Sequence, residues 1–166
     1  MKKTTRSRRG VATIAAAVAI VLGVLASAAP ASASDWGGYA NPAAGGCGSN
    51  YVVKSVPVSY MGATRGYTVG TLQIKWSNGC PGNYARYEAA SGYMPRAIAM
   101  SIQAQASPFN KSGTNEEYVT VAFTRVIALA KSSDRVCAYL DVYTARPTWA
   151  PQSEPTTWKS SVVLCA

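Results

Sequence analysis

The chain has 166 residues, of which 48% are hydrophobic and 14% are charged, and it contains no histidine. This composition is too apolar for a disordered protein, and the missing histidine excludes Ser-His-Asp and Cys-His catalysis and histidine metal sites. Five of the 16 basic residues lie within the first nine positions, and all 7 acidic residues follow them. The rest of the chain therefore holds 11 basic and 7 acidic residues, a much smaller excess than the formal net charge of +9. That mild excess disfavours a nucleic-acid-binding protein, which usually carries a concentrated basic stripe.

Residues 1–33 are predicted to be a signal peptide. A basic head ends at Arg9, an apolar stretch runs from Val11 to Ala29, and Ala31-Ser32-Ala33 is a small-x-small cleavage site. The rival interpretation is a transmembrane anchor, because the apolar run approaches spanning length. We favour cleavage, since alanine is only weakly hydrophobic and the site stands where a cleaved signal needs it. The basic head matches a twin-arginine signal only in part, so the export route stays open. The mature protein is therefore expected to be secreted, with no membrane span.

Residues 34–46 are predicted to form a flexible N-terminal arm, because they are rich in glycine and alanine and have no periodicity. The arm carries two large aromatic side chains, Trp36 and Tyr39. Large anchors on a flexible strip suit insertion into a partner's cleft, although a disordered terminus is the simpler alternative.

Residues 47–166 are predicted to form a single domain that contains all four cysteines: Cys47, Cys80, Cys137 and Cys165. An even count in a small exported protein indicates two disulfides, and three pairings are possible. We favour Cys47–Cys80 with Cys137–Cys165, which would staple each half of the domain separately. The spacing offers no Cys-x-x-Cys pair for a metal site.

The domain shows short alternating segments separated by turn-forming residues, and no helical pattern. In Thr71–Trp76, for example, Leu72 and Ile74 are expected to face one side and Gln73 and Lys75 the other. The predicted strands are Tyr51–Tyr60, Thr71–Trp76, Tyr84–Glu88, Ile98–Gln105, Val119–Ala130, Val136–Thr144 and Ser161–Cys165. Ser107–Glu117 and Pro147–Pro155 are predicted to be loops. The pattern indicates an all-β fold, a small antiparallel β-sandwich or barrel of six to eight strands braced by two disulfides.

No catalytic motif is visible. The seven carboxylates show no pairing that would suit a glycosidase, and the serines form neither a Gly-x-Ser-x-Gly elbow nor a Ser-x-x-Lys box. We therefore expect a protein that is not an enzyme, with no catalytic residues, no metal and no cofactor.

The aromatic content points instead to recognition, with ten tyrosines and four tryptophans against two phenylalanines. Tyrosine and tryptophan combine apolar area with a polar group, which suits binding surfaces. Strand packing accounts for most of the tyrosines. The candidate partner-binding residues are Trp36, Tyr39, Trp149 and Trp158, and the candidate contact elements are the arm and the loops Ser107–Glu117 and Pro147–Pro155.

The segment from Gly70 to Arg86, with its Cys80 turn, resembles a family of exported domains of unknown function from filamentous Gram-positive bacteria, although Tyr84 stands where tryptophan is usual. The opening Cys47-Gly48-Ser49-Asn50-Tyr51 and a cysteine one residue from the end are similar to small spore-associated secreted proteins. The arm with Trp36 ahead of a β domain also resembles the adaptor subunits of umbrella-shaped antibacterial toxin particles. This last resemblance implies an adaptor within an extracellular antibacterial complex.

The main functional hypothesis is a secreted, non-catalytic protein-binding or adaptor module whose partners are other secreted proteins. A secreted protease inhibitor with a rigid, substrate-like loop is one alternative. A mildly cationic protein held to anionic envelope polymers is the other, and high salt would release it.

Overall fold

The computed structural model describes residues 35–43, 47–63, 65–107, 110–129 and 133–166. The predicted signal peptide lies outside the described residues, as do positions 34 and 44–46 of the predicted arm. The described part of the chain contains ten strands. They are β1 Trp36–Gly37, β2 Asn50–Met61, β3 Gly66–Ser77, β4 Gly82–Ala89, β5 Pro95–Ala104, β6 Lys111–Glu116, β7 Val121–Phe123, β8 Ile127–Ala128, β9 Val136–Ala145 and β10 Thr157–Cys165.

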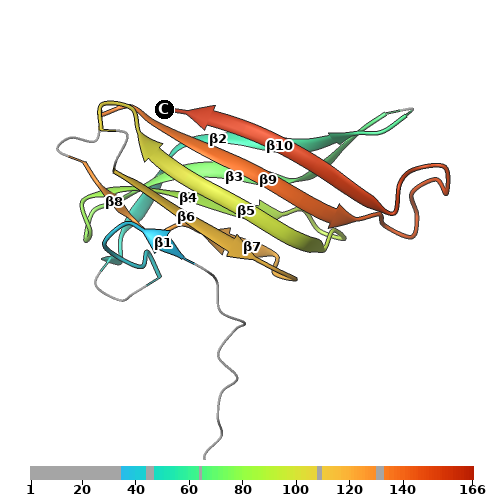
Figure 1. The fold of residues 1–166 in the computed structure, drawn as a ribbon, viewed down its shortest axis with the longest axis horizontal. Helices are drawn as coiled ribbons and strands as arrows, with labels where there is room; N and C mark the ends of the chain where they lie inside the picture. Colours follow the sequence, from blue (N-terminus) through green and yellow to red (C-terminus); the bar gives the residue numbers. More distant parts are fainter. Residues whose placement is uncertain (1–34, 44–46, 64, 108–109, 130–132) are drawn as a thin grey trace, which may run out of the picture.

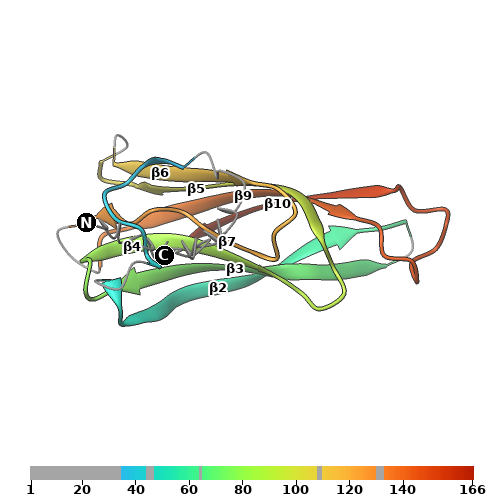
Figure 2. The ribbon, with the colours of Figure 1, turned by 90° about the horizontal axis from the view of Figure 1, so that it is seen from below.

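The strands form two antiparallel sheets that pack face to face. The first sheet has the order β1-β6-β5-β9-β10, and the second has the order β2-β3-β4-β7 with β8 also paired to β4. Figure 1 looks through both sheets, and Figure 2 shows them as two layers. The predicted all-β antiparallel sandwich is confirmed, and the barrel alternative is not, because the sheets do not close on each other.

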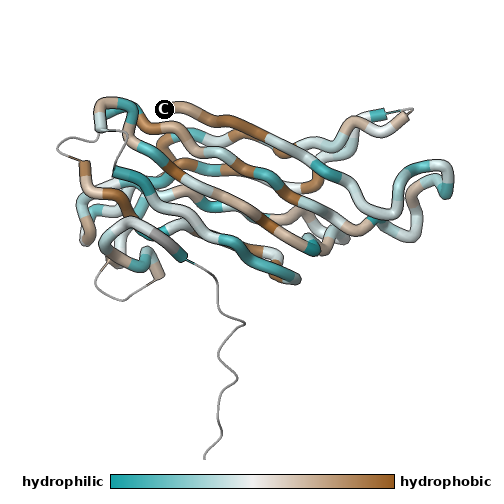
Figure 3. The backbone as a smooth tube through the Cα atoms, viewed as in Figure 1, coloured by the Kyte–Doolittle hydropathy of each residue, from teal (hydrophilic) through white to brown (hydrophobic). Residues whose placement is uncertain are grey.

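The core follows from the alternation of side chains along the strands. Leu72 and Ile74 of β3 are fully buried, and so is the alternating set on β9 that contains Ala138, Leu140 and Val142. Figure 3 shows the result as alternating brown and pale stretches along β5 and β9. Because most inward positions of both sheets are apolar, burial of the two faces against each other is the main source of stability.

Two segments differ from their predicted structure. Val119–Ala130 was expected to be one strand, yet its described part holds two short strands, β7 and β8, separated by Thr124–Val126. Ser107–Glu117 was expected to be a polar loop, yet Lys111–Glu116 is strand β6, paired with β5 from Gln103 to Ile98. The inward positions of β6 are Ser112 and Thr114, both buried. A strand whose inner face is polar gives no apolar alternation, so the sequence pattern missed it. The last strand also begins earlier than predicted, at Thr157 rather than Ser161.

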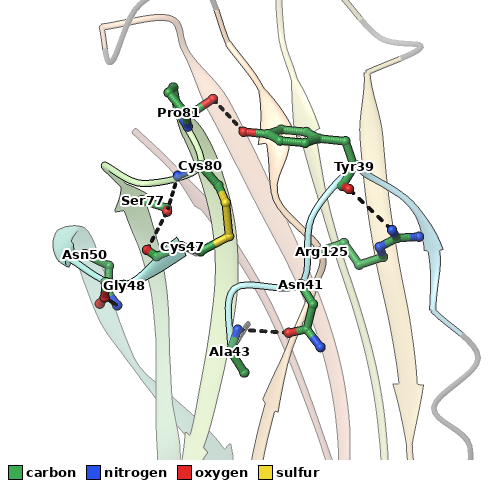
Figure 4. The surroundings of a disulfide bond; sticks show 10 residues. All are labelled: Tyr39, Asn41, Ala43, Cys47, Gly48, Asn50, Ser77, Cys80, Pro81 and Arg125. Carbon is green, nitrogen blue, oxygen red and sulfur yellow. Dashed lines mark hydrogen bonds between the residues drawn. A yellow bond between two sulfur atoms is a disulfide. The ribbon is translucent and has the colours of Figure 1, made fainter. Parts of the chain in front are cut away.

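Both disulfides have the predicted pairing. Cys47 is bonded to Cys80, and Cys137 to Cys165. The second joins residues that face each other directly in the β9–β10 ladder. Around the first, shown in Figure 4, the Ser77 hydroxyl donates to the Cys47 carbonyl at 3.0 Å and accepts from the Cys80 amide at 3.1 Å. Both bridges lie at the end of the sandwich where β2 begins and β10 ends.

The described part of the N-terminal segment lies against this same end of the domain. Strand β1 pairs with β6 through Trp36 and Gly37. The Tyr39 amide then donates to the Val126 carbonyl at 2.9 Å, and the Val126 amide donates to the Ala40 carbonyl at 2.8 Å. The Tyr39 hydroxyl donates to the Pro81 carbonyl at 3.1 Å, and Arg125 donates to the Tyr39 carbonyl (Figure 4). The segment thus bridges β6, of the first sheet, and Val126, just before β8.

Gly37 makes this docking possible, and its replacement by alanine should release the segment. Gly37 has a φ of +67°, and a Cβ built there would lie 2.1 Å from the Lys111 carbonyl oxygen. Since that oxygen is backbone, it cannot move aside, and a left-handed φ already disfavours alanine. In Gly37→Ala we expect the Val126 amide to lose protection from hydrogen exchange. Gly92→Ala is the matched control, because Gly92 has a φ of +84° and open space around it. Equal Val126 protection in wild type and Gly37→Ala would contradict the predicted release.

Candidate functional site

The opposite end of the sandwich gathers five aromatic side chains: Tyr60, Tyr67, Tyr93, Trp149 and Trp158. We call this group the aromatic end. Its members come from the β2–β3 hairpin, the β4–β5 connection, the β9–β10 loop and the start of β10. In Figures 1 and 2 the hairpin and the β9–β10 loop extend together beyond the rest of the sandwich.

Trp158 is the centre of the group. Its ring lies 4.5 Å from that of Tyr60, nearly parallel at 8°, and 4.6 Å from that of Tyr67. Tyr60 and Tyr67 are directly paired across the β2–β3 hairpin, so the hairpin register sets both rings against the indole. Trp158 is 0% exposed. Each stacked aromatic pair contributes about 0.5–1.5 kcal/mol to the free energy of folding beyond the effect of the area that it buries. This stack therefore stabilises the aromatic end.

Trp149 lies at the surface of the group. Its ring is 5.8 Å from Tyr67 and 5.9 Å from Tyr93, the latter edge to face, while 54% of the residue remains exposed. The Arg65 guanidinium lies 4.8 Å from the Tyr67 ring and 6.0 Å from the Trp149 ring. At these distances the cation is attracted to both ring faces. The surface therefore presents an indole with a positive charge beside it.

Two exposed methionines belong to the same segments. Met61, at the end of β2, is 76% exposed, and Met94, just before β5, is 49% exposed. Methionine side chains are flexible and polarisable, so they adapt to irregular apolar surfaces. Met61, Met94 and Trp149 are thus three exposed apolar side chains on the segments that form the aromatic end.

A buried carboxylate ties the β9–β10 loop to the hairpin. Glu154 is only 4% exposed, and it accepts hydrogen bonds from the Tyr60 hydroxyl at 3.1 Å and from the Ala63 amide at 2.8 Å. Burial raises the pKa of Tyr60, and the hydrogen bond to Glu154 and its negative charge raise it further. The phenol therefore stays protonated and donating at neutral pH.

Arg146 braces the loop from inside. Its guanidinium donates to the Pro151 carbonyl at 3.0 Å and to the Glu154 carbonyl at 2.9 Å. These two hydrogen bonds fix Pro151 and Glu154 of the loop to Arg146 at its start. Trp149 lies between Arg146 and Pro151 in the chain, so it is part of the segment that they hold. A loop fixed in this way loses little conformational entropy when it binds, which favours affinity.

The structure separates the four predicted partner-binding residues into two places. Trp149 and Trp158 meet at the aromatic end, whereas Tyr39, 47% exposed, lies at the disulfide-bearing end together with the backbone of Trp36. For Trp158 the prediction needs correction, because a fully buried side chain has no surface to offer a partner. Trp158 instead packs against Tyr67 and Tyr93, the two rings that contact Trp149.

Most of the aromatic end was not predicted from the sequence. Tyr60 was assigned to a predicted strand, whereas Tyr67, Tyr93, Arg65 and Glu154 were not singled out. One signal was available: Tyr60-Met61-Gly62 and Gly66-Tyr67 bracket a short glycine-containing turn, which places the two tyrosines opposite each other in a hairpin.

Within the described residues, no group of three or more Cys, Asp or Glu side chains is placed to hold a metal ion. No helix in that part of the chain is long and apolar enough to cross a membrane. Comparison of the chain with protein-family models, curated proteins and solved structures gives no match.

Proposed function

We propose that this protein is an exported, non-catalytic binding module that docks onto another secreted protein through its aromatic end. The observation that carries the proposal is Trp149, more than half exposed on a loop that Arg146 and Glu154 hold in place. Tryptophan, tyrosine and arginine are the residues that most often dominate binding energy in protein interfaces. Here Trp149, Tyr67 and Arg65 are in mutual contact.

The chemistry of this surface defines the partner. The exposed indole of Trp149 fits an apolar pocket, Met61 and Met94 add exposed apolar side chains on neighbouring segments, and Arg65 favours acidic groups at the rim of that pocket. A specific interface of standard size needs about 800 Å² from each side, so the hairpin and loop must contribute around Trp149. The partner we propose is therefore a protein with an apolar pocket and an acidic rim.

Export is part of the proposal. Two disulfides are consistent with an oxidising compartment, where such bonds form and persist. The predicted signal peptide accounts for how the chain would reach it. The narrower role of an adaptor in an antibacterial complex rests on the resemblance noted above, and the two separated ends of the sandwich suit a bridging role.

The test is capture of partners from culture supernatant by the full mature protein carrying a C-terminal tag. We expect Trp149→Ala to weaken binding of the main captured protein by about 30-fold or more, the effect of losing a hot spot of about 2 kcal/mol. Tyr51→Ala is the matched control, because Tyr51 is 47% exposed at the start of β2, at the disulfide-bearing end. Equal affinity of the two variants for that protein would refute the proposed surface.

A further inference from the structure

A second feature lies on the solvent face of the first sheet, away from the aromatic end. A depression of about 450 Å³ is lined by residues of β5, β6, β9 and β10. Pockets that hold small ligands commonly enclose about 300–1,000 Å³. The depression is therefore large enough for one or two small rings.

The strand register explains why the sheet is hollowed here. One cross-strand row runs Asn115–Ala99–Asp141–Ser161, and the next contains Ser101–Tyr139–Val163. On a sheet, residues in register point to the same face and lie about 5 Å apart. The members of both rows on β5, Ala99 and Ser101, have small side chains. Tyr139 and Asp141 on the neighbouring strand β9 have larger ones, so the surface is lower over β5 than over β9.

The two rows differ in chemistry. The first is polar: Asp141 accepts a hydrogen bond from the Ser161 hydroxyl and lies 3.5 Å from the Lys159 ammonium. Each carboxylate oxygen has a further lone pair for a ligand donor. In the second row, two neighbouring side chains on β9 and β10 are largely apolar and exposed: Tyr139 is 40% exposed and Val163 is 61% exposed. A ligand that fits both rows needs an apolar face and a hydroxyl-bearing edge.

A sugar ring has this combination, because its C–H bonds form an apolar face and its hydroxyls lie at the edge. The flat aromatic ring of Tyr139 can stack on the apolar C–H face of the sugar, and the Asp141 carboxylate can accept hydrogen bonds from the sugar hydroxyls. A purely apolar ligand would desolvate Asp141 without replacing its hydrogen bonds, which is costly. The lining residues include no Lys or Arg, and Lys159 beside them already pairs with Asp141, so the depression favours a neutral ligand over an anion.

We propose that this depression binds a neutral pyranose unit of an extracellular glycan, with Tyr139 as the stacking platform and Asp141 as the hydroxyl acceptor. This goes beyond the proposed function, because it uses the face of the first sheet and none of the residues of the aromatic end. The two sites can therefore succeed or fail separately.

The test is an NMR titration of the mature protein with two soluble neutral glycans, cellotetraose and chitotetraose, up to about 10 mM, which covers weak millimolar binding. We expect at least one of them to shift the backbone amides of Ala99, Tyr139 and Ser161. Tyr139→Ala should weaken that binding at least about tenfold, and Tyr139→Phe should retain it, since the ring is kept.

Tyr51→Ala is the control here too, because Tyr51 is similarly exposed but lies on the other sheet. Its affinity should equal that of the wild type. The proposal is overturned if neither glycan shifts these amides, if the shifts lie elsewhere, or if Tyr139→Ala binds as well as Tyr51→Ala.

Discussion

Replacement of Trp158 by alanine is expected to lower the free energy of unfolding by about 3–5 kcal/mol, the range for removing a large aromatic side chain from a core. Trp158 is completely buried and stacks on Tyr60 and Tyr67, so its loss leaves a cavity between the two sheets. Urea denaturation measures the effect. Trp158→Phe should lose less, because one ring remains in contact with the two tyrosines.

Trp149→Ala is the matched comparison within the same group. Because Trp149 is more than half exposed, its removal should change the free energy of unfolding by less than about 1 kcal/mol. The two substitutions should therefore have different effects: Trp158→Ala should lower stability, and Trp149→Ala should weaken binding. A loss of stability as large in Trp149→Ala as in Trp158→Ala would contradict this division.

Removal of either disulfide is expected to cost about 3–4 kcal/mol, as the chain-entropy account gives for loops of this length. The bridges span 33 residues, from Cys47 to Cys80, and 28 residues, from Cys137 to Cys165. Without them the unfolded chain gains conformational freedom that the folded sheets must overcome. The measurement is the urea midpoint of Cys47→Ala/Cys80→Ala and of Cys137→Ala/Cys165→Ala, each against wild type.

Because both bridges lie at the end opposite Trp149, each double variant that is still folded should keep its affinity for the partner. A midpoint unchanged by removal of either bridge would contradict the expected stabilisation.

The fold was predictable because it depends on two features that can be read directly from the sequence: the alternation of side chains along each strand and the number of cysteines. Leu72 and Ile74 alternate with polar neighbours, and that alternation places them in the core wherever the strand pairs. The four cysteines, an even count, together with the predicted signal peptide indicate two bridges. Strand β6 gave no such signal, because Ser112 and Thr114 take its inward positions. Only its place between β5 and β1 makes it a strand.

The candidate site was less predictable because its contacts join distant parts of the chain. Trp149 drew attention through its proline-rich surroundings, but the same reasoning wrongly placed Trp158 at the surface. Glu154 and Tyr60 are 94 residues apart in sequence, and no local pattern indicates their hydrogen bond. The aromatic end exists only once the hairpin and the β9–β10 loop are brought to the same end of the sandwich.

Hydrogen exchange of the protein alone and in complex with its captured partner tests the central claim most directly. Binding is predicted to slow exchange at the segments that carry Met61, Arg65 and Trp149, while the segment from Trp36 to Ala40 stays as it is in the free protein. Protection confined to that N-terminal segment, or to the disulfide-bearing end, would contradict the assignment of the aromatic end as the docking surface.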